Sequence, residues 1–462
     1  MTVNEATLDF VRQHRNDDVR RLALAVPRDG EVDVSWALQQ IAGWQAARTK
    51  LPSWAATEGL LYPPHLNMEQ CSSEVTARYK GRLVSRLLSA IEKSDEARFS
   101  EDTPLLVDLT GGFGVDFAFM APGRAGERCV YVEHDAQLCA ISSGNFPLLG
   151  LSQAQVVNGD GVDYLHGLSH AALIYLDPAR RDDHGGKTYA ISDCKPDVLA
   201  LGRELTDKAE AVALKLSPML DWHKAVNDLN TVGDVVREVH IVTVDNECKE
   251  LLLLLSAQHS SPLTITCVNN DEVFCFSGSE NSRYEVRGAR CENSIEDLDS
   301  NLVPRTPHPA PRTTESNLVP RTPHPAPRNS IEPRNYLYEP NSSVMKAGCF
   351  DVLQKRYDVA ALGKNSHLFV SDGFIEDFPG RKFQILAVLS MKRFATNLLP
   401  DATAKANIAV RNFPMTAEAL RKKLKLKDGG DTYIFGTTVE ENSMAEKWNI
   451  KTGPALLIAK KT

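Results

Sequence analysis

The sequence contains few of the features that mark secreted, metal-binding or membrane-spanning chains. Its 462 residues include only nine cysteines, and these are scattered, with no C-x-x-C pair and no histidine cluster at ligand spacing. This pattern argues against a zinc site and against a disulfide framework. No apolar run approaches the roughly 18 residues of a membrane span, and the start MTVNEATLDF lacks the apolar core of a signal peptide. We therefore expect a reduced, cytoplasmic protein with no metal and no membrane partner.

Charge and hydrophobicity are ordinary for a globular chain. Hydrophobic residues make up 42% of the sequence and charged residues 24%, so the chain is expected to fold. Its length predicts roughly two to four domains. The apolar run Leu251–Leu255 is too short to span a membrane, and we interpret it as part of a core helix that begins near Asn246.

The most informative segment is LLVDLTGGFGVD, from Leu105 to Asp116. An apolar strand ends in Asp108, and a glycine-rich turn follows it. A turn of this kind lets backbone N–H groups approach a nucleotide-like cofactor closely, although it also fits a tight connection with no ligand. A dinucleotide would need a third glycine where Phe117 stands, and its pyrophosphate would face Asp108. The acidic strand end instead suits S-adenosyl-L-methionine, which carries an ammonium and a sulfonium group.

The next three predicted strands also end in acidic residues, which are Glu133, Asp160 and Asp177. Glu133 follows Asp108 by 25 residues, and an acid at about that distance usually binds ribose hydroxyls. The carboxyl ends of parallel strands form the ligand-binding edge of an open α/β sheet. A single acid at a strand end is common, but four of them in register with a glycine turn predict a cofactor site.

These motifs resemble the class I S-adenosylmethionine-dependent methyltransferases over roughly residues 104–277. The resemblance implies an α/β fold with a Rossmann-like, seven-stranded core, a helical N-terminal region and small α+β C-terminal domains. The cofactor-binding residues that it implies are Asp108, Gly112 and Gly114 along the methionine part, Glu133 at the ribose and Asp160 at the adenine amino group. We also predict that Asp116, the acid that follows the glycine turn, binds the cofactor.

The motif D-P-A-R, from Asp177 to Arg180, stands where amino-methylating members of that family carry D-P-P-x or N-P-P-x. There, a carboxylate or amide and a backbone carbonyl accept hydrogen bonds from an exocyclic amine, which aims the lone pair of the amine at the methyl group. The resemblance therefore implies catalytic roles for Asp177, Pro178 and Arg180. Arg180 replaces an aromatic residue, so a stacking platform for a flipped base is missing at that position.

A similar motif occurs in uracil-C5 RNA methyltransferases, which use a cysteine nucleophile at the end of the next strand. The predicted strand Ala211–Pro218 carries Ser217 there, and a serine is a poor nucleophile at its ordinary pKa. Cys194, the nearest thiol, fits a small, partly buried residue better than a nucleophile. We therefore predict methylation of a nitrogen.

The first hundred residues are predicted to be helical, because apolar residues recur every three or four positions in stretches such as Leu8–Ala25. A further helix is predicted within Glu69–Lys80, and in related methyltransferases a helix at this place closes over the cofactor. We predict that Gln70, Ser73 and Lys80 face the active site and bind substrate. Ser73 would equally fit a helix cap, and Lys80 a solvated charge.

Residues 281–335 differ sharply from the rest in composition. They hold nine of the 25 prolines, and the string SNLVPRTPHPAPR occurs twice, beginning at Ser300 and at Ser316. Such a segment cannot bury enough apolar surface to offset its loss of entropy on ordering. We interpret it as a disordered or extended linker at a domain boundary.

Beyond the linker the charge reverses. From Tyr336 onward there are 19 Lys and Arg against 13 Asp and Glu, a net charge of +6 in a chain whose total is −8. The densest basic run is RKKLKLK, Arg421–Lys427. A basic appendage on an acidic domain indicates a polyanionic partner, although such a run also fits a solvated helix end.

The order of motifs, including E-Q-C-S-S-E and D-P-A-R-R, resembles a bacterial methyltransferase family that ends in a ferredoxin-like module and a THUMP-like domain. The resemblance implies RNA, either tRNA or rRNA, as the partner, because THUMP domains proper bind RNA in tRNA-modifying enzymes. Arg180 and Arg181 are then predicted to contact phosphate. The predicted domains are a helical region (1–100), a methyltransferase core (101–280), the linker (281–335), a ferredoxin-like module (336–380) and a THUMP-like domain (381–462).

Three functions are compatible with these patterns. The first is a methyltransferase that acts on a base nitrogen of RNA. The second is a methyltransferase for a protein or a small molecule, and the third is a non-catalytic RNA-binding protein with a vestigial cofactor site. The intact acids at four strand ends favour the enzymes over the third function, and a nicotinamide enzyme ranks last because the third glycine is missing.

Overall fold

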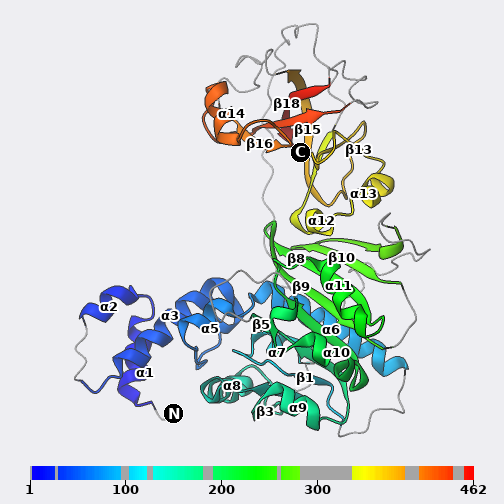
Figure 1. The fold of residues 1–462 in the computed structure, drawn as a ribbon. Helices are drawn as coiled ribbons and strands as arrows, with labels where there is room; N and C mark the ends of the chain where they lie inside the picture. The colour runs from blue at the N-terminus through cyan, green and yellow to red at the C-terminus, as the bar shows by residue number, and fades with distance from the viewer. Residues whose placement is uncertain are drawn as a thin grey trace, which may run out of the picture. The chain divides into compact units, whose positions relative to one another are not determined.

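The computed structural model describes residues 3–25, 30–94, 103–121, 128–180, 191–257, 262–280, 336–390, 405–440 and 452–462 (Figure 1). The chain divides into two compact units, Met1–Asp271 and Glu272–Thr462. The predicted linker, 281–335, lies outside the described residues. No helix in the described part of the chain combines the length and the apolar character needed to cross a bilayer.

Six helices precede the first strand in the described residues. The stretch predicted over Leu8–Ala25 forms two of them, because the chain turns between His14 and Val19. The side chain of Asn4 caps the first helix by accepting a hydrogen bond from the backbone N–H of Thr7 (2.9 Å), which satisfies one of the free donors at the helix start. The helices are α1 (Glu5–His14), α2 (Val19–Ala25), α3 (Val34–Lys50), α4 (Pro52–Ala55), α5 (His65–Gln70) and α6 (Glu74–Ser94).

A large sheet follows these helices in the first unit. Its strands are β1 (Leu106–Asp108), β2 (Cys129–Glu133), β3 (Gln155–Asn158), β4 (Ala171–Leu176), β7 (Ala209–Leu216), β8 (Val236–Val244), β9 (Glu247–Leu255) and β10 (Thr264–Asn269). The connecting helices are α7 (Val115–Met120), α8 (Ala136–Leu148), α9 (Gly161–Gly167), α10 (Val198–Asp207) and α11 (Trp222–Leu229). A separate pair of short strands, β5 (Ala179–Arg180) and β6 (Cys194–Lys195), runs antiparallel.

Within the first unit, the strands of this sheet follow the order β10-β8-β9-β7-β4-β1-β2-β3. Neighbouring strands from β3 to β7 are parallel, so their carboxyl ends meet at one edge. Helices alternate with these strands, as Figure 1 shows, and this arrangement confirms the predicted α/β fold with a parallel core. Within the described residues the unit has one strand more than the seven predicted, because β10 pairs in parallel beside β8.

The apolar run Leu251–Leu255 is a strand, so the prediction of a core helix there is wrong. It forms the second half of β9, which runs antiparallel between β7 and β8, and all five leucines are buried. Asp245 and Asn246, the residues between β8 and β9, both have positive φ (51° and 63°), as a tight hairpin turn requires. A strand that is buried on both faces can carry apolar residues at every position. Such a run has neither the period of a strand nor that of a helix, so its pattern does not distinguish the two.

An aromatic cluster lies beneath the glycine turn of the first unit. Phe117 of α7 has no exposed surface, and its ring centroid lies 5.6 Å from that of Tyr131 in β2 and 5.1 Å from that of Phe146 in α8. On the other flank, α6 is tied to β8 by a hydrogen bond between Tyr79 Oη and His240 Nδ1 (2.7 Å). Packed interiors of this kind hold the strand ends in a fixed geometry.

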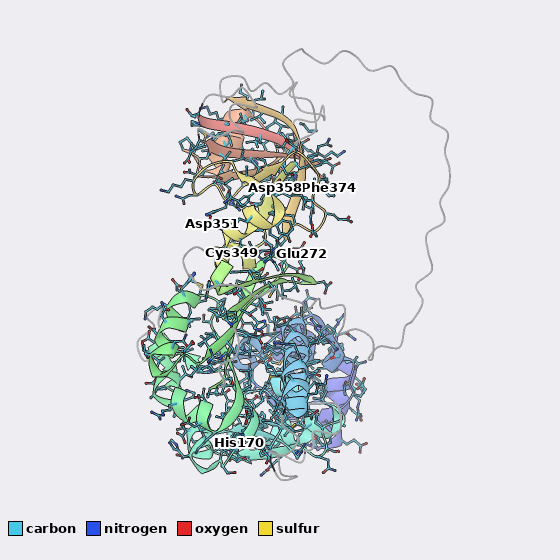
Figure 2. All side chains as sticks on the ribbon, turned by 90° about the vertical axis from the view of Figure 1, so that its right-hand side faces the viewer. His170, Glu272, Cys349, Asp351, Asp358 and Phe374 are labelled. Carbon is cyan, nitrogen blue, oxygen red and sulfur yellow. The ribbon has the colours of Figure 1, made fainter. Side chains whose placement is uncertain are left out.

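The second unit contains a sheet of its own. The strands of this sheet follow the order β13-β14-β12-β15-β18-β17-β16, antiparallel except for β16 and β17. Cys349 precedes the helix α13, and Asp358 ends it in the left-handed region (φ 49°); both are labelled in Figure 2. The strand β11 (Glu272–Ser277) begins this unit but is not part of this sheet. The other elements are β12 (Tyr336–Pro340), α12 (Ser342–Ala347), α13 (Phe350–Tyr357), β13 (Ala360–Ala361), β14 (Phe369–Ser371), β15 (Gly380–Ser390), β16 (Asn407–Arg411), α14 (Ala417–Leu424), β17 (Thr432–Val439) and β18 (Gly453–Lys461).

Candidate active site

The glycine turn between β1 and α7 is tightly specified. Gly112 and Gly114 have positive φ (59° and 80°), which side chains rarely allow. At Gly111 a Cβ would lie 2.3 Å from the ring of Tyr131, so glycine is required there for space. The Tyr131 hydroxyl donates a hydrogen bond to the Gly112 carbonyl (2.5 Å), and the Gly112 N–H donates to Glu133 Oε2 (2.7 Å). The turn is therefore fastened to the end of β2.

Asp108 lies at the end of β1 and is only 1% exposed. Its Oδ1 accepts a hydrogen bond from the backbone N–H of Thr110 (2.9 Å). Burial raises the pKa of Asp108 to about 8, against the effect of the Thr110 hydrogen bond, and the nearby carboxylates of Asp116 and Asp177 add to the rise. A cation placed beside this carboxyl group would favour its ionised form.

Glu133 and Asp160 follow β1 along the same edge of the sheet. Glu133 is 6% exposed and accepts hydrogen bonds from two backbone N–H groups, those of Gly112 and Asp135 (2.7 and 2.8 Å). Asp160 is exposed and caps α9, accepting from the backbone N–H of Val162 (2.7 Å). Carboxylate oxygens can accept further hydrogen bonds beside these. Both side chains can therefore still accept ligand hydroxyl or amino groups.

The chemistry of this edge fits S-adenosylmethionine. The groups at the ends of β1, β2 and β3 are carboxyls, which attract an ammonium group and accept hydrogen bonds from a ribose or an amino group. A pyrophosphate would instead place its acceptor oxygens beside the carboxyl oxygens of Glu133 and Asp160, which need hydrogen-bond donors. Asp108, Gly112, Gly114, Glu133 and Asp160 are the residues that would hold the cofactor.

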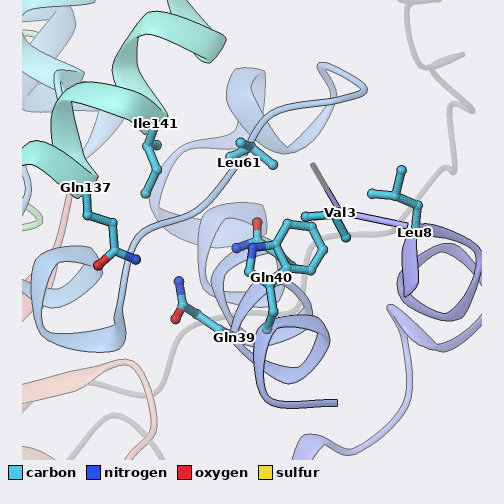
Figure 3. Close-up of a pocket in the computed structure, with 8 residues that line it drawn as sticks. Val3, Leu8, Gln39, Gln40, Leu61, Gln137 and Ile141 are labelled. Atoms are coloured by element: carbon cyan, nitrogen blue, oxygen red, sulfur yellow. The ribbon is translucent and has the colours of Figure 1, made fainter. Parts of the chain in front are cut away.

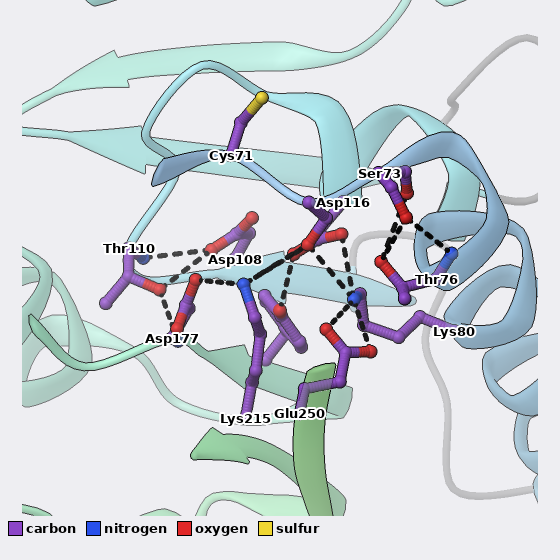
Figure 4. Close-up of polar contacts among 12 residues, drawn as sticks. Cys71, Ser73, Thr76, Lys80, Asp108, Thr110, Asp116, Asp177, Lys215 and Glu250 are labelled. Carbon is purple, nitrogen blue, oxygen red and sulfur yellow. Dashed lines mark hydrogen bonds and ion pairs between the residues drawn. The ribbon is translucent and has the colours of Figure 1, made fainter. Parts of the chain in front are cut away.

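Asp177 follows β4, and its side chain is 38% exposed. Its backbone N–H donates to Thr110 Oγ1 (2.7 Å), so Thr110 links it to Asp108 (Figure 4). The Oδ2 atom of Asp177 lies 2.6 Å from Nζ of Lys215 in β7. Pro178, the next residue, is buried. The structure thus presents a partly exposed carboxylate at the same edge as the candidate cofactor residues.

The structure describes the arginines that follow Pro178 only in part. Arg180 pairs with Cys194 through the backbone, as part of β5 and β6, and its side chain is outside the described atoms. Arg181 lies outside the described residues. Cys194 is 4% exposed, in agreement with a small buried residue.

A buried group of charged residues lies behind Asp177. Lys80 of α6 is bonded to both carboxylate oxygens of Glu250 in β9 (2.7 Å each) and lies 3.2 Å from Oδ1 of Asp116 in α7. The Ser72 hydroxyl donates to Asp116 Oδ2 (2.8 Å) and accepts from Nζ of Lys80 and of Lys215 (3.1 and 3.2 Å). Tyr175 of β4 also donates to Asp116 Oδ2, at 2.8 Å. We call these the buried ion network, whose members are Ser72, Lys80, Asp116, Tyr175, Lys215 and Glu250.

The opposite charges in the buried ion network stabilise one another. Burial alone would raise the pKa of Asp116, but the ammonium groups of Lys80 and Lys215 outweigh it and lower that pKa to about 2. Burial lowers the pKa of Lys215, yet the neighbouring carboxylates, led by Asp177, raise it overall. Burial raises the pKa of Glu250, in opposition to the effect of Lys80.

The residues that we predicted to bind substrate occupy three different environments. Lys80 is 1% exposed and is a member of the buried ion network rather than a solvated charge. Ser73 bonds the Thr76 N–H and hydroxyl (3.3 Å each) at the start of α6, as a helix cap does, and Gln70 is exposed at the end of α5. Their binding of substrate stays a prediction.

Four members of the buried ion network were not among the predicted site residues; they are Ser72, Tyr175, Lys215 and Glu250. Lys215 interrupts the apolar string AVALKLS, and Glu250 precedes five leucines in CKELLLLL. A charged side chain inside a buried strand needs a partner, so these positions carried a usable signal. The partners themselves are remote in sequence, since Lys80 and Glu250 are separated by 170 residues.

Two further features of the first unit lie apart from this edge. A cavity of about 260 Å³ lies between the N-terminal helices and α8 (Figure 3); it is lined by Val3, Leu8, Trp36, Gln39, Gln40, Leu61, Gln137 and Ile141. None of the predicted site residues lines it. The described residues contain no group of three or more His, Cys, Asp or Glu side chains that could hold a metal ion.

Comparison with known proteins identifies relatives of both units. A family of ferredoxin-like domains matches residues 336–379, and a THUMP domain-like family matches residues 380–454. The crystal structure of a candidate methyltransferase from Porphyromonas gingivalis W83 is similar over 100% of both chains, with 26% identity and a TM-score of 0.70. No curated protein matches the sequence.

Shorter structures are similar to parts of the chain at low TM-scores. The N-terminal domain of human METTL16, in complex with SAH, has 12% identity and a TM-score of 0.32, covering 56% of this chain and 100% of its own. A candidate RNA methyltransferase from Pyrococcus horikoshii has 15% identity and a TM-score of 0.28, covering 45% of this chain and 95% of its own. At such scores these two similarities carry no argument about this chain.

Proposed function

The chain has the fold of the class I methyltransferases and ends in ferredoxin-like and THUMP-like domains, and from this premise we propose that it transfers a methyl group from S-adenosylmethionine to a base nitrogen of RNA, in tRNA or rRNA. The proposal depends on one observation above all. The partly exposed carboxylate of Asp177 lies at the same strand edge as the buried carboxyl of Asp108, and Thr110 bonds both residues.

In the proposed complex, the methionine part of the cofactor lies against Asp108, Gly112 and Gly114, while Glu133 accepts the ribose hydroxyls and Asp160 the adenine amino group. The cofactor supplies an electrophilic methyl group bound to a positively charged sulfur. Asp116 acts indirectly, because its carboxylate is committed to the buried ion network. It fixes the start of α7 and therefore the glycine turn.

The acceptor amine is held by the chain itself. The Asp177 carboxylate and the Pro178 carbonyl accept its two N–H hydrogens, which leaves the nitrogen lone pair directed at the methyl group. Orientation of this kind supplies most of the rate enhancement when two reactants must meet in line. An exocyclic base amine in a folded RNA has to be unstacked before it reaches the site, and we propose that Arg180 and Arg181 contact the neighbouring phosphates.

Recognition of RNA is assigned to the second unit. In the run RKKLKLK, Leu424 and Leu426 are buried, while Lys422, Lys423, Lys425 and Lys427 are exposed. The leucines anchor the end of α14 on the sheet, and the lysines are thereby presented together on the surface. Exposed lysines attract phosphate and make binding depend on salt. The match to THUMP-like domains supports the same assignment.

The proposed function is tested by methyl transfer to RNA. Total tRNA and rRNA from cells that lack the protein are incubated with the full chain and with labelled S-adenosylmethionine. We expect label in a modified base of the RNA, and we expect Asp177→Ala to abolish transfer while cofactor binding, measured by calorimetry, persists. Label found only in the protein or small-molecule fraction, or equal transfer by the Asp177→Ala variant, would contradict the proposal.

A further inference from the structure

Lys215 is an unusual residue for the centre of a buried sheet. Its side chain is 13% exposed, and it stands in β7, directly beside β4, the strand that Asp177 follows. Its ammonium lies 2.6 Å from Asp177 Oδ2, 3.2 Å from Ser72 Oγ and 3.5 Å from Asp116 Oδ2. These three contacts match the three N–H donors of an ammonium group.

A lysine at this place is costly if it serves only to stabilise the fold. Removal of an ammonium group from water is expensive, and apolar residues often replace a buried ion pair with no loss of stability. The flanking residues Leu214 and Leu216 are buried and apolar, so the strand otherwise follows the apolar pattern. The shortest contact of Lys215 is the one to Asp177, the single member of this group that is exposed to a substrate.

The contact fixes one half of the Asp177 carboxylate. Lys215 binds Oδ2, and no described residue donates a hydrogen bond to Oδ1. Meanwhile the backbone N–H of Asp177 is held by Thr110 Oγ1. With both the main chain and Oδ2 fastened, the direction of Oδ1 is set before a substrate arrives. Pre-set geometry of this kind is what in-line transfer requires.

We propose that Lys215 is a positioning residue, which holds the Asp177 carboxylate in the orientation that accepts the substrate amine. The inference rests on the proposed function, because it concerns the acceptor residue of that reaction. Ser72 and Asp116 in turn hold Lys215 through its two remaining N–H bonds. Since Ser72 comes just before α6, the N-terminal helical region completes the active site.

The charges around Lys215 all come from neighbouring elements. They are the carboxylates of Asp177 after β4, Asp116 on α7 and Glu250 on β9, with the ammonium group of Lys80 on α6 beside the last two. The negative charges exceed the positive ones in this group, so Lys215 stays protonated, in line with its raised pKa. A protonated lysine keeps its bond to the carboxylate over the working pH range.

The test compares Lys215→Met, which removes the charge at similar length, with Lys215→Arg, which keeps it. Lys208→Met is the matched control, because Lys208 precedes the same strand and pairs with Glu204 away from the site (2.8 Å). All variants are made in the full chain. We expect Lys215→Met to lower kcat for methylation of RNA by about 10- to 100-fold, with KM for RNA and Kd for S-adenosylmethionine unchanged. Lys215→Arg should recover part of the loss, and Lys208→Met should show none.

A double-mutant cycle with Asp177→Asn supplies the second readout. If Lys215 acts through Asp177, the Lys215→Met substitution lowers kcat no further in the Asp177→Asn background, and the shifts in urea midpoint of the two single variants do not add. If the shifts in urea midpoint of the two single variants add in the double variant, or if their losses in kcat multiply, the inference is overturned. Midpoint shifts that do not add, together with an unchanged kcat for Lys215→Met, overturn it as well, because the contact would then serve only the stability of the fold.

Failure of the proposed function has a different signature. If the unmodified chain transfers no label to RNA, the RNA methyltransferase proposal fails. The double-mutant cycle in urea unfolding still decides whether Lys215 holds Asp177. Midpoint shifts that do not add support the contact, and shifts that add refute it.

Discussion

Asp108 combines deep burial with a carboxyl group, and this combination makes stability depend on pH. Its folded-state pKa is about 8, whereas an unfolded aspartate titrates near ~3.9. Because the folded pKa is the higher one, the stabilising contribution is complete below about pH 4 and is lost as the pH rises through about 8. The neutral acid is the form that fits the pocket without a ligand.

The Asp108→Asn variant tests this interpretation. An amide has no titration in this range, so the original chain should lose stability relative to the variant as the pH rises from about 5 to about 8, and the difference should level off above that pH. Denaturant unfolding followed by tryptophan fluorescence measures it, because four of the five tryptophans lie in the first unit. Parallel pH profiles for the two proteins would show that Asp108 is not buried as described.

Lys80 makes a second prediction at the residue scale. Breaking a buried ion pair by removing one partner costs about 3–5 kcal/mol, because the other charge is left uncompensated. We expect that loss for Lys80→Met, since Glu250 and Asp116 both face its ammonium group. The double variant Lys80→Met, Glu250→Leu should recover part of it. A loss no larger for Lys80→Met than for a change at the exposed Lys93 would indicate that Lys80 is solvated.

At the scale of elements, the glycine turn is the part least tolerant of change. In Gly111→Ala, the new Cβ would meet the Tyr131 ring at 2.3 Å and displace the end of β2. We expect a lower melting temperature together with loss of cofactor binding. Gly167→Ala is the matched control, because nothing lies within 4 Å of its Cβ and it ends the helix α9. Equal melting temperatures for the two variants would contradict the geometry of the turn.

The comparison of sequence and structure shows which elements are predictable. The strands β1 to β4 were found because each is a short apolar run that ends near a polar residue, and the glycines after Asp108 mark a specific turn. The type of the element β9 is not predictable, because a run of leucines shows neither the two-residue period of a strand nor the 3.6-residue period of a helix. The partners of Lys215 are not predictable, because Ser72 is 143 residues away and sequence patterns report only neighbours along the chain.

At the scale of the whole molecule, the proposal requires the basic C-terminal unit to bind RNA. Each lysine that contacts a phosphate should add about one unit to the slope of log affinity against log salt. We therefore expect Lys422→Glu, Lys423→Glu to weaken binding of bulk tRNA by the full chain and to reduce that slope by about two. Fluorescence anisotropy between 50 and 200 mM salt measures both quantities.

The control for the RNA experiment is Lys355→Glu, Lys364→Glu, which changes the same net charge at two other exposed lysines of the second unit. It should leave most of the affinity intact. Equal losses for the two double variants would mean that net charge alone governs binding. In that case the RKKLKLK run would have no specific role.

The account as a whole depends on the ligand of the acidic strand edge. Calorimetric titration of the full chain with S-adenosylmethionine, and separately with NAD, tests it most directly. We expect S-adenosylmethionine to bind at one site per chain, to bind more weakly after Glu133→Ala, and NAD to give no binding heat. Binding of NAD in place of S-adenosylmethionine, or no binding of S-adenosylmethionine, would contradict the account.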